Sequence, residues 1–126
     1  METSLPGLLG MELLELEHGR ARGRLSLHGR LMAPNGFVHA GSVITLADTC
    51  CGQGCRASFP EGVTSFTTVE LKSNFLRSTK AGDALVCHAE LAHAGRTTQV
   101  WDAAVVRESD GAQVALFRCT QYLLRD

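Results

Sequence analysis

The sequence is poor in charge over one long stretch: between Arg30 and Arg56, Asp48 is the only Asp, Glu, Lys or Arg. Aromatic residues make up only 6% of the chain, and the net charge is only −1. A near-neutral chain lacks the basic patch with which proteins bind nucleic acid or an anionic membrane surface. No apolar run approaches the ~20 residues that a membrane-spanning helix needs. We therefore expect neither nucleic acid nor a membrane as a partner.

The number and spacing of the cysteines indicate neither disulfide bonds nor a metal site. The five cysteines are odd in number, and the first residues lack the basic and apolar segments of a signal peptide, so we expect reduced thiols and a cytoplasmic location. Cys51 and Cys55 lie four residues apart with His39 nearby. A zinc site usually needs a second pair of ligands, and none is evident. We expect no metal site, with these cysteines packing as small apolar residues.

Periodicity predicts two short strands, one long helix and four further strands. Apolar and polar residues alternate over residues 11–16 and 21–27, as in half-buried strands. Residues 41–58 are apolar on more than one stripe, which is typical of a buried helix, and Gly52 and Gly54 would let a sheet approach it closely. The remainder is rich in β-branched and aromatic residues, broken by turn signals. The 126 residues fit a single α+β domain, with a curved antiparallel sheet wrapped around the helix.

Asp48 lies within this helix, nine residues after His39. Burying an unpaired carboxylate is costly, so a chain without a use for it would more easily carry Ala or Leu there. Two interpretations stay open: Asp48 faces solvent, or it acts in catalysis as nucleophile or general base. Nine helical residues rise ~13 Å and end half a turn out of alignment, so His39 and Asp48 of one chain lie far apart. A site that uses both needs two chains across a symmetric interface.

The start of the helix, at Ala40 and Gly41, offers unpaired backbone N–H groups and the positive end of the helix dipole. Such groups suit a carbonyl oxygen that gains negative charge during acyl transfer. With a carboxylate from the second chain, they would suffice to hydrolyse an activated ester such as a thioester. His39 has an alternative role as a helix cap or a packed core residue.

The segment PNGFVHAGSVITLADT, residues 34–49, resembles the His-Gly-Gly…Leu-Ala-acid-Thr signature of hotdog-fold acyl-CoA thioesterases, of the phenylacetate-degradation and 4-hydroxybenzoyl-CoA types. TTVELKSNFLRSTKAGD is similar to the family's strand after the helix, and GRTTQVWDAAVVRESDGAQVALFRCT to its last hairpin. The resemblance runs from Gly10 to Tyr122 and implies a hotdog fold of about six strands around one central helix. It also implies hydrolysis of an acyl-CoA, aryl-CoA included, with CoA as part of the substrate and no cofactor.

The resemblance implies a role for each matching residue. Asp48 would be the catalytic carboxylate, and the Ala40 N–H would polarise the thioester carbonyl, with Gly41 beside it. His39 would orient the loop or the thioester. Thr68 falls where relatives place a Ser or Thr that positions the attacking water, although a Thr-rich strand favours threonine by propensity alone.

The sequence departs from the family pattern at two positions. Ala40 replaces the first glycine of the usual His-Gly-Gly but keeps its N–H, so the oxyanion role survives. Ala33 stands where relatives carry Asn or Gln, six residues before His39. Asn35, two residues further on, is our candidate substitute for that amide.

Three basic residues, Arg77, Lys80 and Arg96, lie in or beside predicted turns. One or two of them could bind CoA phosphates, and the alternative is that all are simply solvated. The resemblance implies a homodimer that forms the site and pairs into a tetramer. Two other functions stay open: a dehydratase of 3-hydroxyacyl thioesters, whose motifs differ from LADT, and a non-catalytic acyl-CoA-binding module, which would not need the acid. The sequence does not indicate which acyl group is bound.

Overall fold

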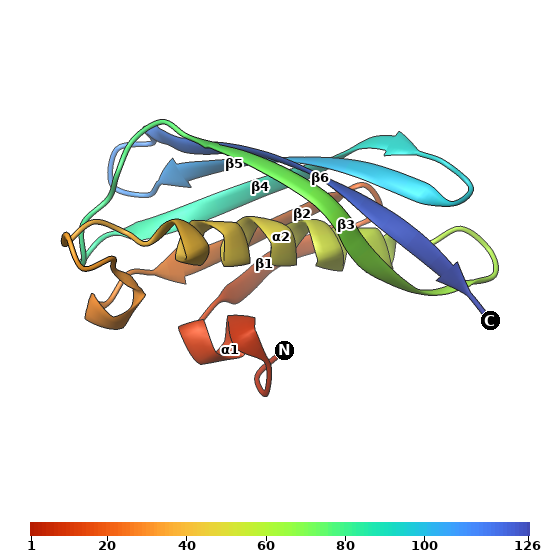
Figure 1. Ribbon diagram of the computed structural model, residues 1–126, viewed down its shortest axis with the longest axis horizontal. Helices are drawn as coiled ribbons and strands as arrows, with labels where there is room; N and C mark the ends of the chain where they lie inside the picture. The colour runs from red at the N-terminus through yellow and green to blue at the C-terminus, as the bar shows by residue number, and fades with distance from the viewer.

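The computed structural model describes residues 1–126 and contains one six-stranded antiparallel sheet that curves around one long helix (Figure 1). In chain order the elements are α1 (Leu5–Leu9), β1 (Glu12–Glu17), β2 (Arg20–Ser26), a 3-10 turn (Gly29–Leu31), α2 (Ala40–Ala57), β3 (Val63–Phe75), β4 (Ala84–Ala94), β5 (Thr98–Arg107) and β6 (Gln113–Arg125). The strand order is β1-β2-β4-β5-β6-β3. The predicted α+β class and order of elements are confirmed, and the long helix begins and ends one residue earlier than predicted. No helix combines the length and apolar character needed to cross a bilayer.

Helix α2 lies along the inner face of the sheet (Figure 1), and every residue from Gly41 to Cys55 is at least partly buried. Two glycines set the distance between the helix and the sheet. A Cβ on Gly54 would come within 2.5 Å of the fully buried Trp101 ring, and a Cβ on Gly52 within 3.0 Å of the Phe66 ring. The prediction that these glycines admit the close approach of a sheet is confirmed.

All five cysteines are buried in the core and none forms a disulfide. Burial raises the pKa of the Cys55 thiol to about 12. A thiol with such a pKa stays protonated at neutral pH, and it is the thiolate that attacks electrophiles or binds metals. No three His, Cys, Asp or Glu side chains are grouped as a metal site would require. The cysteines therefore pack as small apolar residues, as predicted.

A β-bulge interrupts β3. Thr68 and Glu70 pair with consecutive residues of β6, so Val69 has no partner across the ladder. The extra residue shifts the alternation by one position. Leu71, opposite the buried Cys119, is therefore on the inner face, whereas Glu70 is on the outer face. Thr68 is the last inner-face residue before the bulge and is directed at α2.

The two edges of the sheet differ in character. β1 is a six-residue strand that contains three glutamates, a composition that discourages pairing with another strand. β3 has thirteen residues and exposes Val69 by 58%, Leu71 by 40% and Phe75 by 46%. A long edge with exposed apolar side chains is a template for pairing. β3 is therefore the edge suited to contact another chain.

Candidate active site

The first turn of α2 leaves one backbone donor free. His39 is the N-cap residue, and its Nδ1 accepts a hydrogen bond from the Gly41 N–H at 2.8 Å. The N–H groups of Ser42 and Val43 both donate to the His39 carbonyl, at 2.9 and 3.4 Å. The Ala40 N–H has no acceptor within the chain, and Ala40 is exposed. Of the two N–H groups expected to bind an oxyanion, Ala40 therefore offers a free one, while that of Gly41 is engaged by the cap.

The cap also fixes how His39 carries its proton. Because Nδ1 accepts a hydrogen bond, the neutral ring holds its proton on Nε2, which is then a donor. The capping role considered for His39 is confirmed. Since His39 is exposed, the Nε2–H is available to a ligand at the start of the helix.

An apolar hollow of about 400 Å³ adjoins this free N–H. It lies between the start of α2 and the end of β3, and it is lined by Val38, Ala40, Val43, Phe75, Leu76, Arg77, Ser78 and Val114. Apolar pockets with few convergent polar groups are typical of small-molecule sites. The hollow could therefore admit the end of a substrate whose carbonyl meets the Ala40 N–H.

The three basic residues singled out in the sequence do not lie together. Arg77 lines the hollow and donates to the Gln113 carbonyl at 2.9 Å, and Lys80 lines the neighbouring hollow with Phe37. Arg96 lies in the turn between β4 and β5, near the far end of α2, whose 18 residues span about 27 Å. Within one chain, only Arg77 and Lys80 are near the start of the helix.

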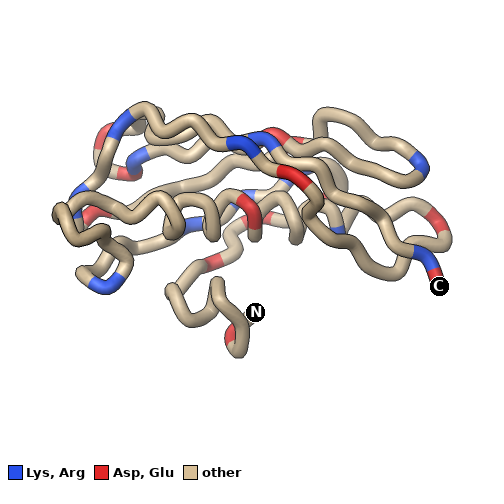
Figure 2. The backbone as a smooth tube through the Cα atoms, in the orientation of Figure 1, with Lys and Arg blue, Asp and Glu red and all other residues tan.

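Asp48 lies halfway along α2 and is half-buried, in the stretch without other charges that Figure 2 shows. It forms no ion pair within the chain. Burial raises the pKa of this carboxyl, and a hydrogen bond from Thr68 opposes that shift. The Thr68 Oγ1 lies 3.2 Å from the Asp48 Oδ1. Asp48 is therefore partly desolvated and hydrogen-bonded to Thr68 of β3. An acid that simply faced solvent would show neither property.

Thr68 also contacts a residue that sequence reasoning missed. Its Oγ1 lies 2.8 Å from the Oε1 of Gln121, its partner across the β3–β6 ladder, and Gln121 is fully buried. The inner-face positions of β6 are otherwise apolar in the sequence. Gln121 could have been found in the sequence as the one polar residue among the apolar, inward-facing positions of this strand.

The site residues thus form two groups at separate places on α2. Asp48 and Thr68 meet in the middle of the helix, whereas His39 and Ala40 lie at its start, about 12 Å along the axis. Asn35 joins neither group by a hydrogen bond: it is exposed in the preceding loop, and its Oδ1 accepts from the Phe37 N–H at 3.2 Å. The predicted separation of His39 from Asp48 within one chain is confirmed.

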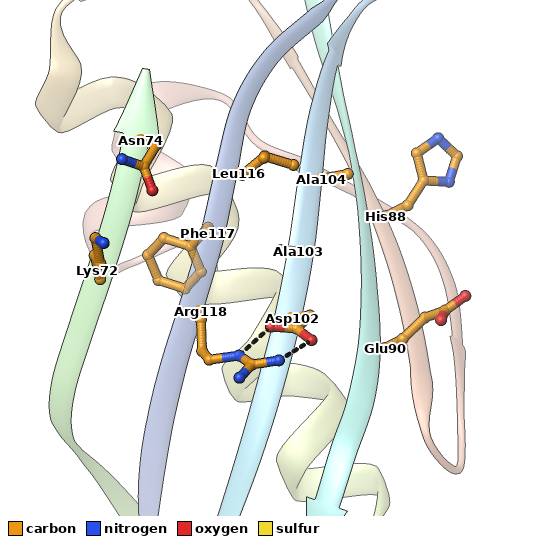
Figure 3. Close-up of a pocket in the computed structure, with 10 residues that line it drawn as sticks. All are labelled: Lys72, Asn74, His88, Glu90, Asp102, Ala103, Ala104, Leu116, Phe117 and Arg118. Carbon is orange, nitrogen blue, oxygen red and sulfur yellow. Dashed lines mark hydrogen bonds and ion pairs between the residues drawn. The ribbon is translucent and has the colours of Figure 1, made fainter. Parts of the chain in front are cut away.

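A larger hollow lies on the other side of the sheet, with α2 behind it (Figure 3). Its charged residues include Lys72, Glu90 and an ion pair in which Arg118 Nη2 donates to Asp102 Oδ2 at 2.7 Å. Neither Asp48 nor Ala40 lines it. This outer-face hollow is therefore separate from the candidate site.

Known proteins share the sequence pattern and the fold of this chain. Residues 35–113 match the family described as the thioesterase superfamily. The 1,4-dihydroxy-2-naphthoyl-CoA hydrolase of Listeria monocytogenes is 30% identical over 112 residues, which cover 89% of each protein. Acyl-coenzyme A thioesterase PaaI of Escherichia coli is 30% identical over 110 residues, 87% of this chain and 75% of that protein.

Solved structures give the same result. The structure of E. coli PaaI has a TM-score of 0.86 at 26% identity, covering 94% of this chain and 83% of that one. The structure of smu.793 from Streptococcus mutans, bound to acetyl CoA, has a TM-score of 0.84 at 25% identity, covering 93% and 90%. The chain belongs to the thioesterase superfamily. The predictions of a hotdog fold and of a thioesterase enzyme are confirmed, while the roles of individual residues stay predictions.

Proposed function

We propose that this protein hydrolyses acyl-CoA thioesters to a free carboxylate and CoA, at sites formed by two subunits. The observation that carries the proposal is one helix with a free N–H at its exposed start and a partly desolvated carboxylate at its middle. Two relatives that are 30% identical are named as CoA thioester hydrolases, and one structural neighbour binds acetyl CoA. These similarities support CoA as part of the substrate.

A dimer is required because the two groups cannot meet on one carbonyl within a chain. The β3 edge supports this proposal, since it is long, unpaired and apolar at Val69, Leu71 and Phe75. A two-fold axis beside β3 would extend the sheet from one subunit into the next. Such an isologous interface creates two equivalent sites per dimer. Pairing of dimers into tetramers and a cytoplasmic location stay expectations.

The reaction follows from the groups present. The thioester carbonyl oxygen would accept a hydrogen bond from the Ala40 N–H and gain its negative charge there. Asp48 of the partner subunit would either remove a proton from a water that attacks the carbonyl carbon, or attack that carbon itself. If Asp48 acts as a base, the carbon–sulfur bond then breaks and the CoA sulfur leaves as a thiol with the proton that Asp48 collected. If Asp48 attacks the carbon, CoA leaves as a thiolate and a water hydrolyses the mixed anhydride of Asp48 and the acyl group, which frees Asp48 and supplies the proton that the thiolate takes. Burial raises the pKa of Asp48, which makes it a stronger base than an exposed aspartate.

The remaining residues would hold the substrate. The Nε2–H of His39 would orient the thioester beside Ala40. Arg77 and Lys80 are our candidates for the CoA phosphates, because both lie near the start of α2. Arg96 could reach the same substrate only from the partner subunit. Asn35 remains a candidate through its Nδ2, because only its Oδ1 is occupied by the loop.

The test is release of free thiol from a panel of aryl- and aliphatic acyl-CoAs. Asp48→Asn keeps the size of the side chain and removes the base, and we expect kcat to fall by at least about 100-fold. Asp102→Asn is the matched control, since it removes a carboxylate on the outer face, away from the site. Equal loss in both variants, or no release by the wild type from any acyl-CoA, would refute the proposal. Tight binding of CoA esters without hydrolysis would favour the binding module instead.

A further inference from the structure

A chain of four polar side chains runs from Asp48 into the core. Thr68 Oγ1 lies 3.2 Å from Asp48 Oδ1 and 2.8 Å from Gln121 Oε1, and Gln121 Nε2 lies 3.4 Å from Cys119 Sγ. Gln121 and Cys119 are fully buried, so no solvent can satisfy their polar atoms. Each hydrogen bond in the chain therefore needs a donor from within the chain.

The direction of these hydrogen bonds depends on whether Asp48 is ionised. Thr68 has one hydroxyl proton, and an ionised Asp48 needs that proton. If Gln121 presents its oxygen to Thr68, two oxygens compete for the single proton. The two ends of an amide have nearly the same shape, and a half turn exchanges them without moving other atoms. After the turn, Nε2 donates to Thr68, Thr68 donates to Asp48, and the Cys119 thiol donates to Oε1.

We propose that Gln121 is a positioning residue, whose amide donates to Thr68 Oγ1 and thereby commits the Thr68 hydroxyl proton to the ionised Asp48. This inference rests on the proposed function, because a base must be ionised and held in one orientation before it acts. Gln121 touches no substrate in this scheme and acts only through Thr68. Of the two orientations of the Gln121 amide, only this one avoids a competition of two oxygens for the Thr68 proton when Asp48 is charged.

Within the same chain, few other groups act on this carboxylate. On the inner face the titratable neighbours are the thiols of Cys51 and Cys119, and their contact raises the pKa of Cys51 well above its ordinary range. Cys51 therefore stays neutral at the pH of the assay. Glu70 follows the bulge on the outer face, where it accepts a hydrogen bond from Thr120. Within the chain, Thr68 is thus the hydrogen-bond donor to Asp48, and it opposes the rise in the Asp48 pKa that burial causes.

The test is the pKa of Asp48, read from its carboxyl ¹³C resonance in the full-length protein without substrate. Thr68→Val removes the donor to a charged group, and we expect the Asp48 pKa to rise by about one pH unit. Gln121→Met keeps the volume and removes the amide, and we expect a rise of about 0.3–0.5 unit, because it removes only the polarisation of the hydroxyl. The acid limb of the kcat/KM profile should move in the same direction.

The chain provides a matched control in Gln99, which is also buried and lies opposite Gln121 in the β5–β6 ladder. Its Nε2 donates to the Ser58 carbonyl and its Oε1 accepts from the Trp101 indole, away from Asp48. Gln99→Met should lower stability by a similar amount and leave the Asp48 pKa unchanged. A purely structural role for Gln121 would make the two variants alike in both measurements.

The sign of the shift decides the outcome. If the Gln121 oxygen competes for the Thr68 proton, Gln121→Met lowers the Asp48 pKa; that result, or no change, overturns the proposal. Wild-type protein gives a second measurement should the variant not fold. Above the Asp48 pKa, the Gln121 side-chain amide protons should show NOEs to Thr68, and NOEs to Cys119 instead would also overturn it.

The experiments distinguish a failure of the proposed hydrolysis from a failure of the role proposed for Gln121. If no acyl-CoA is hydrolysed while the pKa shift and the NOEs are as expected, the proposed function is wrong and the hydrogen-bond chain stands. If hydrolysis is normal and depends on Asp48 while Gln121→Met leaves the Asp48 pKa unmoved, only the role of Gln121 is wrong.

Discussion

Replacing Ala40 with proline should remove one hydrogen from the site and leave the fold intact. Ala40 is the first residue of α2, a position where proline is favoured because the N–H has no helical partner. Proline also requires an extended residue before it, and His39 already has φ −68° and ψ 135°. Because the Ala40 N–H has no acceptor in the chain, no internal hydrogen bond is lost.

The expected effect on activity is large, and the effect on stability is small. Removing one oxyanion donor typically lowers kcat by about 10²–10³-fold, which is about 2.7–4 kcal/mol of transition-state stabilisation. A proline that fits the native backbone restricts the unfolded chain, so stability should stay equal or rise by about 0.4–1 kcal/mol. Since the other N–H groups of the first turn are engaged by His39, the helix has no spare donor to replace it.

The assay compares kcat for thiol release with thermal unfolding followed by circular dichroism. Ala40→Gly is the matched control, because it keeps the N–H and should retain kcat to within a few-fold. A folded Ala40→Pro enzyme with wild-type kcat would show that the carbonyl is polarised elsewhere. A variant that unfolds would instead contradict the helix start described above.

Three further predictions concern the carboxylate, the core and the dimer. Burial raises the pKa of Asp48, so the folded state loses stability relative to the unfolded state as pH rises from the ordinary aspartate pKa to the raised one. Urea titrations should therefore show Asp48→Asn gaining stability over wild type at pH 7 but not at pH 3, and a gain that does not change with pH would contradict the burial. Gly54→Ala should cost about 1–3 kcal/mol in urea unfolding, because its Cβ would come 2.5 Å from the buried Trp101, whereas Gly29→Ala meets nothing within 4 Å and should be neutral. Leu71→Lys adds a charge at a partly exposed position of the edge strand β3, so light scattering should show a monomer, which we expect to be folded and without activity, and an active dimer would refute the proposed interface.

The fold was predictable because its main signals are repeated along the chain. Alternation of apolar and polar residues defines each strand. Apolar residues on nearly all sides of the predicted helix 41–58 identified the buried helix, with its ends correct to within one residue. Asp48 was visible for a related reason, since one charge stands out in a stretch that has no other. Features that depend on many residues, or on the absence of charge over a long stretch, can be predicted without knowledge of the three-dimensional contacts.

The contacts around Asp48 were not predictable in the same way. Val69 disturbs the alternation by a single residue, and this bulge turns Glu70 to the outer face while Thr68 faces the helix. Gln121 is 73 positions from Asp48 in sequence and reaches it only through the β3–β6 register. A one-residue change in the register of β3 would have turned Thr68 outward, away from Gln121 and Asp48. The chemistry of the carboxylate therefore depends on a register that local patterns do not encode.

The start of α2 shows most clearly that residue identity alone does not reveal which groups of a site are free to bind a ligand. Ala40 and Gly41 each have an N–H, and only the family resemblance, not the chemistry of the residues, gave a reason to prefer Ala40. The structure distinguishes them through His39, whose side chain takes the Gly41 N–H and whose carbonyl takes the next two. The same hydrogen bonds that complete the cap leave the Ala40 N–H as the one donor that a ligand can reach. The substitution of alanine for glycine at position 40 is harmless to this arrangement, because the useful group belongs to the backbone.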